Sequence, residues 1–144
     1  MQLLWGLIVV GLSLLAWGSQ FITWVAPRTG ARFELTGSDD AGEPAYWIDF
    51  RGEAPFAAVT LWTMVVAGIL MILDIDAWAY FGLVGGGMYI YFAGRAIFMR
   101  IAARREGLPV GTLKNHRFRY TMLVVWALMG LITIAAAVVS LQTG

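Results

Sequence analysis

The sequence predicts an all-α, four-helix transmembrane bundle, that is, a polytopic integral membrane protein. Three observations lead to this prediction: 60% of the 144 residues are hydrophobic, only 13% are charged, and the charges form clusters separated by long uncharged runs. An average soluble domain has about 25% charged residues. The composition therefore argues against a soluble enzyme, a disordered tail and a nucleic-acid-binding domain. The absence of Cys excludes disulfides and thiol chemistry.

The four predicted helices come from four runs without Asp, Glu, Lys or Arg, each at least 18 residues long. A helix that crosses a bilayer needs about 20 mainly apolar residues, and a chain in lipid must satisfy its backbone hydrogen bonds internally. No basic residue precedes the first run, so we expect a retained helix there and not a cleaved signal peptide. We predict one domain, 1–144, with spans at about 3–26, 54–73, 77–98 and 119–141 and loops at 28–53 and 100–118.

The distribution of basic residues predicts the orientation of the chain. Three of the ten basic residues lie between the first two spans, and the other seven lie between Arg95 and Arg119. The positive-inside rule places segments rich in Lys and Arg in the cytoplasm. We therefore expect both loops to be cytoplasmic, and both termini and the Asp74–Asp76 hairpin to lie outside, in a bacterial cytoplasmic (inner) membrane.

The two predicted loops carry opposite charge. The first has three Arg against six acidic residues, a net of −3, and the segment 95–119 has seven basic residues against one Glu, a net of +6. A basic side chain near an anionic lipid surface contributes about 1 kcal/mol to binding. We expect contacts with lipid headgroups from six side chains: Arg100, Arg104, Arg105, Lys114, Arg117 and Arg119.

One basic residue, Arg95, lies at the inner edge of the third span. A guanidinium so close to hydrocarbon either reaches outward to the headgroups or pairs with a carboxylate. Glu53 and Asp49 are predicted at the same level, and Glu53 with Pro55 suits the first turn of a helix. We expect an ion pair between Arg95 and Glu53 or Asp49, with headgroup contact of Arg95 as the alternative.

Small residues recur at helical spacing within the spans and predict the faces through which the helices pack. Helices in lipid associate by close van der Waals approach, which small side chains permit. Gln20 is the most polar uncharged side chain in any span, and we expect it to hydrogen bond to another helix. The predicted packing residues are Gly6, Ser13, Gln20, Gly82, Gly86, Gly94, Ala127, Gly130 and Ala137.

Residues able to support catalysis or to bind a metal are scarce. The chain has one His and no Cys, so we predict no metal site, and no known catalytic motif is present. Aromatic side chains inside the spans are more often part of the core than of a ligand site. We predict no cofactor, although a bound lipid or quinone is an alternative, and its candidate residues are Tyr89, Tyr91, Trp62 and Trp126.

These observations favour a non-enzymatic membrane protein. We expect an accessory or scaffold subunit that packs through its small-residue faces against a larger membrane complex or a second copy. Two alternatives remain open. One is a small channel or transporter at an oligomer axis, lined by Arg95, Gln20 and the tyrosines within the spans. The other is a binder of a hydrophobic cofactor such as a quinone, pigment or lipid. The expected partners are anionic lipid headgroups and other membrane subunits, and no nucleic acid.

Overall fold

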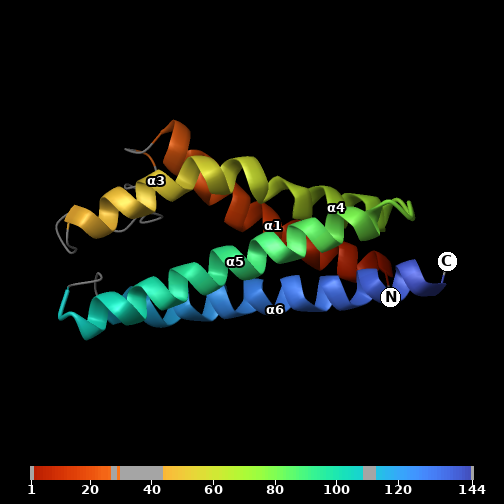
Figure 1. Ribbon diagram of the computed structural model, residues 1–144. Helices are drawn as coiled ribbons and strands as arrows, with labels where there is room; N and C mark the ends of the chain where they lie inside the picture. The colour runs from red at the N-terminus through yellow and green to blue at the C-terminus, as the bar shows by residue number, and fades with distance from the viewer. Residues whose placement is uncertain (1, 27–28, 30–43, 109–112, 144) are drawn as a thin grey trace.

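The computed structural model describes residues 2–26, 29, 44–108 and 113–143, and within these ranges the regular structure is entirely helical (Figure 1). The helices are α1 (Gln2–Val25), α3 (Pro44–Thr60), α4 (Trp62–Ile72), α5 (Trp78–Arg105) and α6 (Leu113–Thr143).

Four helical segments are long and apolar enough to cross a membrane, and α3 and α4 together supply the second of them. The prediction of an all-α chain with four such segments is confirmed. The segments are Gln2–Val25, Arg51–Ile72, Trp78–Arg105 and Arg117–Thr143.

The helices form an antiparallel arrangement in which α5 and α6 lie side by side over most of their length (Figure 1). Helix α4 packs against both α5 and α1, and α3 packs against α1. Helices α1 and α6 approach each other closely over only a short stretch. The start of α1, the end of α6 and the α4–α5 turn lie at one end of the bundle, and the start of α3 and the end of α5 lie at the other (Figure 1).

Several helices extend beyond the predicted spans. Helix α5 runs on to Arg105, α6 starts at Leu113, and α3 starts at Pro44. Charged and polar residues such as Arg and Lys form helices well, so the end of an apolar run does not mark the end of a helix. Glu53 and Pro55 consequently lie inside α3, and the prediction that they occupy a first helical turn is wrong.

Two left-handed residues terminate the long helices. Asp74 (φ 56°) follows α4, and Gly107 (φ 71°) follows α5. After each of them the chain folds back in the same way: Ile75 N–H donates to the Leu70 carbonyl (3.0 Å), and Leu108 N–H donates to the Ala103 carbonyl (2.9 Å). These are the bonds of a Schellman motif. They satisfy carbonyl groups that otherwise lack a partner at the end of the helix.

A short irregularity at Leu61 separates α3 from α4. The Leu61 N–H donates to the Ala57 carbonyl (2.9 Å), as in a regular α-helix, while Met64 N–H donates to the Leu61 carbonyl (3.3 Å), only three residues before it. A bond over three residues is the tighter 3₁₀ type, so the helix is locally irregular at this junction.

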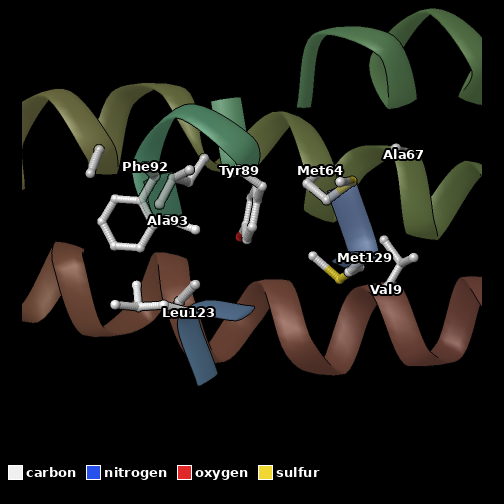
Figure 2. Packing of buried hydrophobic residues seen from close by; sticks show 11 residues of the cluster. Val9, Met64, Ala67, Tyr89, Phe92, Ala93, Leu123 and Met129 are labelled. Carbon is white, nitrogen blue, oxygen red and sulfur yellow. The ribbon is translucent and has the colours of Figure 1, made fainter. Parts of the chain in front are cut away.

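The core contains few bulky side chains and many alanines. Figure 2 shows Val9 of α1, Met64 of α4, Tyr89 of α5 and Met129 of α6 converging between the helices, all of them buried. Alanines occupy much of the remaining buried surface, so the helices approach one another closely. The main cluster consists of Val9, Ala16, Ala57, Leu61, Met64, Ala67, Tyr89, Phe92, Ala93, Leu123 and Met129.

Helices α5 and α6 are closest at a pair of facing glycines. A Cβ atom added at Gly86 would lie 2.7 Å from the Gly130 carbonyl oxygen and 2.6 Å from Ile134 Cγ1. A Cβ atom added at Gly130 would lie 2.8 Å from the Gly86 carbonyl oxygen. Both distances to backbone oxygen are shorter than van der Waals contact, so only glycine allows this separation of the two helices.

Glycines also set the distances between α4 and its two neighbours. A Cβ atom at Gly68 would lie 3.0 Å from the Val10 backbone nitrogen of α1, and one at Gly6 would lie 3.0 Å from the Gly68 carbonyl oxygen. On the opposite side, a Cβ atom at Gly85 of α5 would lie 2.8 Å from the Met64 nitrogen. The helix pairs α1–α4, α4–α5 and α5–α6 are therefore all held together through backbone-to-backbone contact.

We predict that Gly86→Ala destabilises the bundle, whereas Gly87→Ala at the neighbouring position does not. Overpacking a close contact costs about 1–3 kcal/mol, while a Cβ atom at Gly87 meets nothing within 4 Å and alanine favours the helix by up to about 1 kcal/mol. Thermal unfolding of the purified protein in mild detergent tests this, with a midpoint lower by several degrees expected for Gly86→Ala. Equal midpoints for the two variants would contradict the glycine contact.

Candidate functional site

An ion pair joins α3 and α5. The Arg95 guanidinium donates from Nη1 to Oε2 of Glu53. The Glu53 side chain is 9% exposed and the Arg95 side chain 27% exposed. Of the two carboxylates expected to pair with Arg95, the structure places Glu53 beside it, while the side chain of Asp49 lies outside the described residues.

The ion pair lies near one end of the apolar length of α5. At 1.5 Å per residue, the helix rises about 26 Å from Trp78 to Arg95. A hydrocarbon layer is about 30 Å thick. A layer that began at the α4–α5 turn would therefore end just beyond the pair, which is the level at which a charged side chain reaches polar headgroups.

A pocket of about 310 Å³ opens beside the ion pair. Its lining combines the charged groups of Glu53 and Arg95 with the aromatic rings of Phe56 and Tyr91, which are 53% and 54% exposed. Gly52 completes the lining, and a Cβ atom there would meet nothing within 4 Å. The pocket thus offers a paired cation and anion next to two exposed aromatic rings, which suits a ligand that is partly polar and partly apolar.

The other aromatic side chains with polar atoms hold helices together. The Tyr89 hydroxyl donates to the Ser13 carbonyl (2.9 Å), and Trp126 Nε1 donates to the Leu12 carbonyl (2.9 Å). Trp17 Nε1 donates to the Ala58 carbonyl (2.8 Å), in the last turn of α3. A carbonyl oxygen has two lone pairs and can accept a side-chain donor in addition to its helical bond. These rings therefore connect α1 to α3, α5 and α6.

The four aromatic candidates for a cofactor site do not converge. Tyr89 is fully buried and bonded to α1, and Trp126 is bonded to α1 with its ring 6.2 Å from Phe92. Trp62 is exposed, with its ring 6.4 Å from that of Phe81. Tyr91 alone lines the pocket. Phe56, also in the pocket, was missed because its place beside Tyr91 depends on the packing of α3 on α5.

The predicted packing residues have different surroundings. Gln20 is buried, with 5% of its surface exposed, and most of the other predicted packing residues are buried too. Ala127 is partly buried against the core. Gly94 differs, because a Cβ atom there would meet nothing within 4 Å. The buried ones are Gly6, Ser13, Gln20, Gly82, Gly86, Gly130 and Ala137.

Some of the residues expected at lipid headgroups are exposed, and others are not. Arg104, Arg105 and Arg117 are exposed, and the Arg104 guanidinium lies 5.7 Å from the centre of the Tyr120 ring. Arg100 differs from the expectation, since it is only 6% exposed and donates from Nη1 to the Ala96 carbonyl (2.8 Å).

This position of Arg100 follows from the helical repeat, which places it on the same face of α5 as the buried Ala93 and Ala103. Arg119 is partly exposed, and the side chain of Lys114 lies outside the described residues.

Within the described ranges, no three His, Asp or Glu side chains lie close enough together to hold a metal ion. Comparisons with protein families, with curated proteins and with solved structures find no match for this chain. The ion pair and the pocket are thus interpreted from their own geometry.

We predict that Arg95 and Glu53 are energetically coupled. Replacing either one with Gln leaves its partner charged in a largely enclosed site, and that costs more than losing the pair as a whole. In a double-mutant cycle, Arg95→Gln and Glu53→Gln together should therefore cost less than the sum of the single changes, with a coupling of about 0.5–3 kcal/mol. Denaturant unfolding in detergent micelles measures it.

Arg105→Gln provides the matched control, because Arg105 is exposed and surface substitutions usually change stability by less than about 0.5 kcal/mol. Strictly additive effects of the two pair variants would show that the contact contributes nothing.

Proposed function

We propose that the protein is a non-enzymatic, multi-pass integral membrane protein that acts as an accessory or scaffold subunit of a larger membrane complex or of a homo-oligomer. Support for the membrane location comes from large apolar side chains exposed on every helix. Examples are Leu15 (62%), Val59 (59%), Phe98 (72%) and Val139 (58%). Four long helices with apolar outer faces are stable in lipid, whereas in water such surfaces would aggregate.

We propose a bacterial cytoplasmic membrane, with both termini on the outer side. The support is the distribution of basic residues together with the ends of the bundle. The termini and the α4–α5 turn, which contains no Lys or Arg, lie at one end. The exposed Arg104, Arg105 and Arg117 lie toward the other end, which by the positive-inside rule is cytoplasmic.

The polar side chains named above hold the helices together, and this structural role favours a scaffold over a catalyst. Trp17, Tyr89 and Trp126 donate to backbone carbonyls of neighbouring helices, and Arg95 donates to Glu53. Gln20 and Tyr89, which a channel at an oligomer axis would expose, are buried inside the single chain.

The observation that carries the assembly proposal is an apolar stripe on the outer face of α1. Its residues alternate at spacings of three and four, which is the heptad pattern of helices that pack in parallel by knobs into holes. The larger members are exposed, and a Cβ atom at either glycine would meet nothing within 4 Å. The α1 stripe consists of Leu4, Leu7, Gly11, Leu14, Gly18, Phe21 and Val25.

The glycines in this stripe contrast with those in the interior. Gly6, which lies outside the stripe, touches α4 backbone to backbone, whereas Gly11 and Gly18 face open space. Glycine costs about 1 kcal/mol relative to alanine within a helix, and close approach of a second helix offsets that cost. We therefore propose that the α1 stripe receives a helix from a second copy or from another subunit.

We predict that a single cysteine at the end of α6 is accessible from outside the cell. The chain contains no Cys, so Gln142→Cys and Glu106→Cys each introduce one thiol at an exposed position. A membrane-impermeant maleimide added to intact cells should label Gln142→Cys at once and Glu106→Cys only after permeabilisation. Labelling in the reverse order would contradict the proposed orientation.

We predict that a cysteine in the α1 stripe cross-links in native membranes. A disulfide requires Cα atoms about 4.4–6.8 Å apart, a separation that helices packed at Gly11 attain. Under mild oxidation Gly11→Cys should therefore give an adduct with twice the mass of the chain, or a larger one with another subunit. Val139→Cys, exposed on α6, is the matched control and should remain monomeric. A monomeric Gly11→Cys would count against assembly through α1.

A further inference from the structure

Two exposed arginines, Arg104 of α5 and Arg117 of α6, carry charges that the described part of the bundle does not balance. In the part of the chain that the structure describes, no carboxylate pairs with either guanidinium, and neither guanidinium donates a hydrogen bond. By contrast, Arg95 pairs with Glu53, and Arg100 is buried against its own helix. Arg104 and Arg117 therefore present unbalanced positive charge at the surface.

Tyr120 brings these two arginines to one place. The Arg104 guanidinium carbon lies 5.7 Å from the centre of the Tyr120 ring, within the range of a cation–π contact. Arg117 precedes Tyr120 by three residues on α6, and side chains at this spacing are neighbours on the surface of a helix. Both arginines are therefore neighbours of the same ring, one on each helix.

The facing glycines give the level of this cluster along the bundle. Gly86 faces Gly130, and α5 and α6 are antiparallel. Tyr120 and Arg117, ten and thirteen residues before Gly130, are therefore level with positions 96 and 99 of α5. At 1.5 Å per residue, these levels are about 27 and 32 Å from Trp78. A hydrocarbon layer of about 30 Å that begins at the α4–α5 turn ends between them, so the cluster lies at the level of the lipid phosphates.

A phosphate group suits two guanidinium groups at this level. Arginine presents five N–H donors in a planar fork, which binds phosphate oxygens in bidentate fashion. The contact between Arg104 and the Tyr120 ring depends on the charge of the guanidinium and uses none of its N–H groups as hydrogen-bond donors. The donors of Arg104 and Arg117 are thus available to a ligand.

The charge of the surroundings favours a lipid whose headgroup is anionic. The segment 95–119 has a net charge of +6, and Glu106 is its single acidic residue. Glu106 is exposed, and within the described ranges it forms no ion pair. The ammonium of a zwitterionic headgroup would lie in this positive potential at a cost. An anionic headgroup brings a phosphate without a cation, and basic side chains near an anionic lipid add to its binding.

We propose that Arg104 and Arg117 together bind the phosphate of an anionic phospholipid beside the ring of Tyr120. The sequence predicts headgroup contact for six basic side chains, and this proposal selects two of them as a site and specifies the charge of the lipid. It rests on the membrane location proposed above. It does not rest on assembly through the α1 stripe, because the two surfaces share no residue.

The test is lipid retention. Membranes are first washed with carbonate, which removes proteins that are not integral, and the protein is then placed in nanodiscs that contain equal amounts of phosphatidylethanolamine, phosphatidylcholine and phosphatidylglycerol with identical acyl chains. Native mass spectrometry identifies the lipid that stays bound. We expect phosphatidylglycerol to be retained several-fold over each zwitterionic lipid. Added inorganic phosphate should not displace it, because a free ion lacks the acyl chains.

Variants distinguish a site from general attraction to the basic end of the bundle. Arg104→Gln and Arg117→Gln should each lower retention of phosphatidylglycerol about fivefold, the effect of one basic side chain near an anionic surface. Both positions are exposed, so the thermal unfolding midpoint of each variant should stay close to that of the unaltered protein. Arg51→Gln removes the same charge at an exposed position of α3. It is the matched control and should leave retention unchanged.

Retention of either zwitterionic lipid at or above the level of phosphatidylglycerol by the unaltered protein would overturn the proposal. So would undiminished retention in both Arg104→Gln and Arg117→Gln, or an equal loss in Arg51→Gln, which would show general attraction. Displacement of the lipid by inorganic phosphate would show a site for a free anion instead. Release of the chain by the carbonate wash would overturn the membrane location, so the two failures are distinguishable.

Discussion

The contact between Gly86 and Gly130 sets the separation of α5 and α6, and the arrangement of the other helices depends on this pair. Each carbonyl oxygen lies less than 3 Å from the position that a Cβ atom on the facing glycine would take, so the two backbones are in contact. The same type of contact continues from α5 to α4 at Gly85 and from α4 to α1 at Gly68. Three helix pairs, α5–α6, α4–α5 and α1–α4, are thus held at backbone contact, whereas α1 and α6 approach each other over only a short stretch.

The α1–α6 side is wider, and large side chains bridge it. Trp126 Nε1 reaches the Leu12 carbonyl at 2.9 Å, and Trp5 Nε1 reaches the Thr133 hydroxyl at 3.3 Å. An indole provides both the length to cross the gap and a donor that must be satisfied where water is excluded. Trp17 of α1 donates a comparable bond to a carbonyl of α3, and Tyr89 of α5 donates one to a carbonyl of α1. Helix α1 is therefore joined by directional bonds to α3, α5 and α6, while its contact with α4 is made by the glycines.

Much of the architecture could be predicted from sequence because it depends on composition over long segments. The four uncharged runs give the number of helical segments long enough to cross a membrane, and the charged segments between them give the limits of these apolar lengths. The pairing of Arg95 with Glu53 was among the predicted alternatives because both residues border an apolar run at the same level. Helix ends were less predictable, because Arg, Lys and Glu continue a helix as readily as they end one. The left-handed residues Asp74 and Gly107 mark the ends of α4 and α5, which the positions of the charged residues alone do not predict.

What composition could not provide is the face on which each small or polar residue lies. Gly86 and Gly87 are neighbours in the sequence, yet one touches α6 and the other faces outward. Arg100 and Arg104 belong to one basic cluster, yet one is buried against its own helix and the other lies over Tyr120. A helix turns by about 100° per residue, so a shift of one position moves a side chain from core to surface.

Because residues at successive positions of a helix point in different directions, the α1 stripe and the pocket beside the ion pair lie on separate surfaces of the bundle. The α1 stripe lies on an outward side of α1 that is distinct from the side packed on α4, whereas the pocket is formed by α3 and α5. A helix docked on Gly11 and Gly18 therefore leaves Phe56 and Tyr91 uncovered. The outward apolar stripe of α1 and the pocket between α3 and α5 are thus separate features that share no residue.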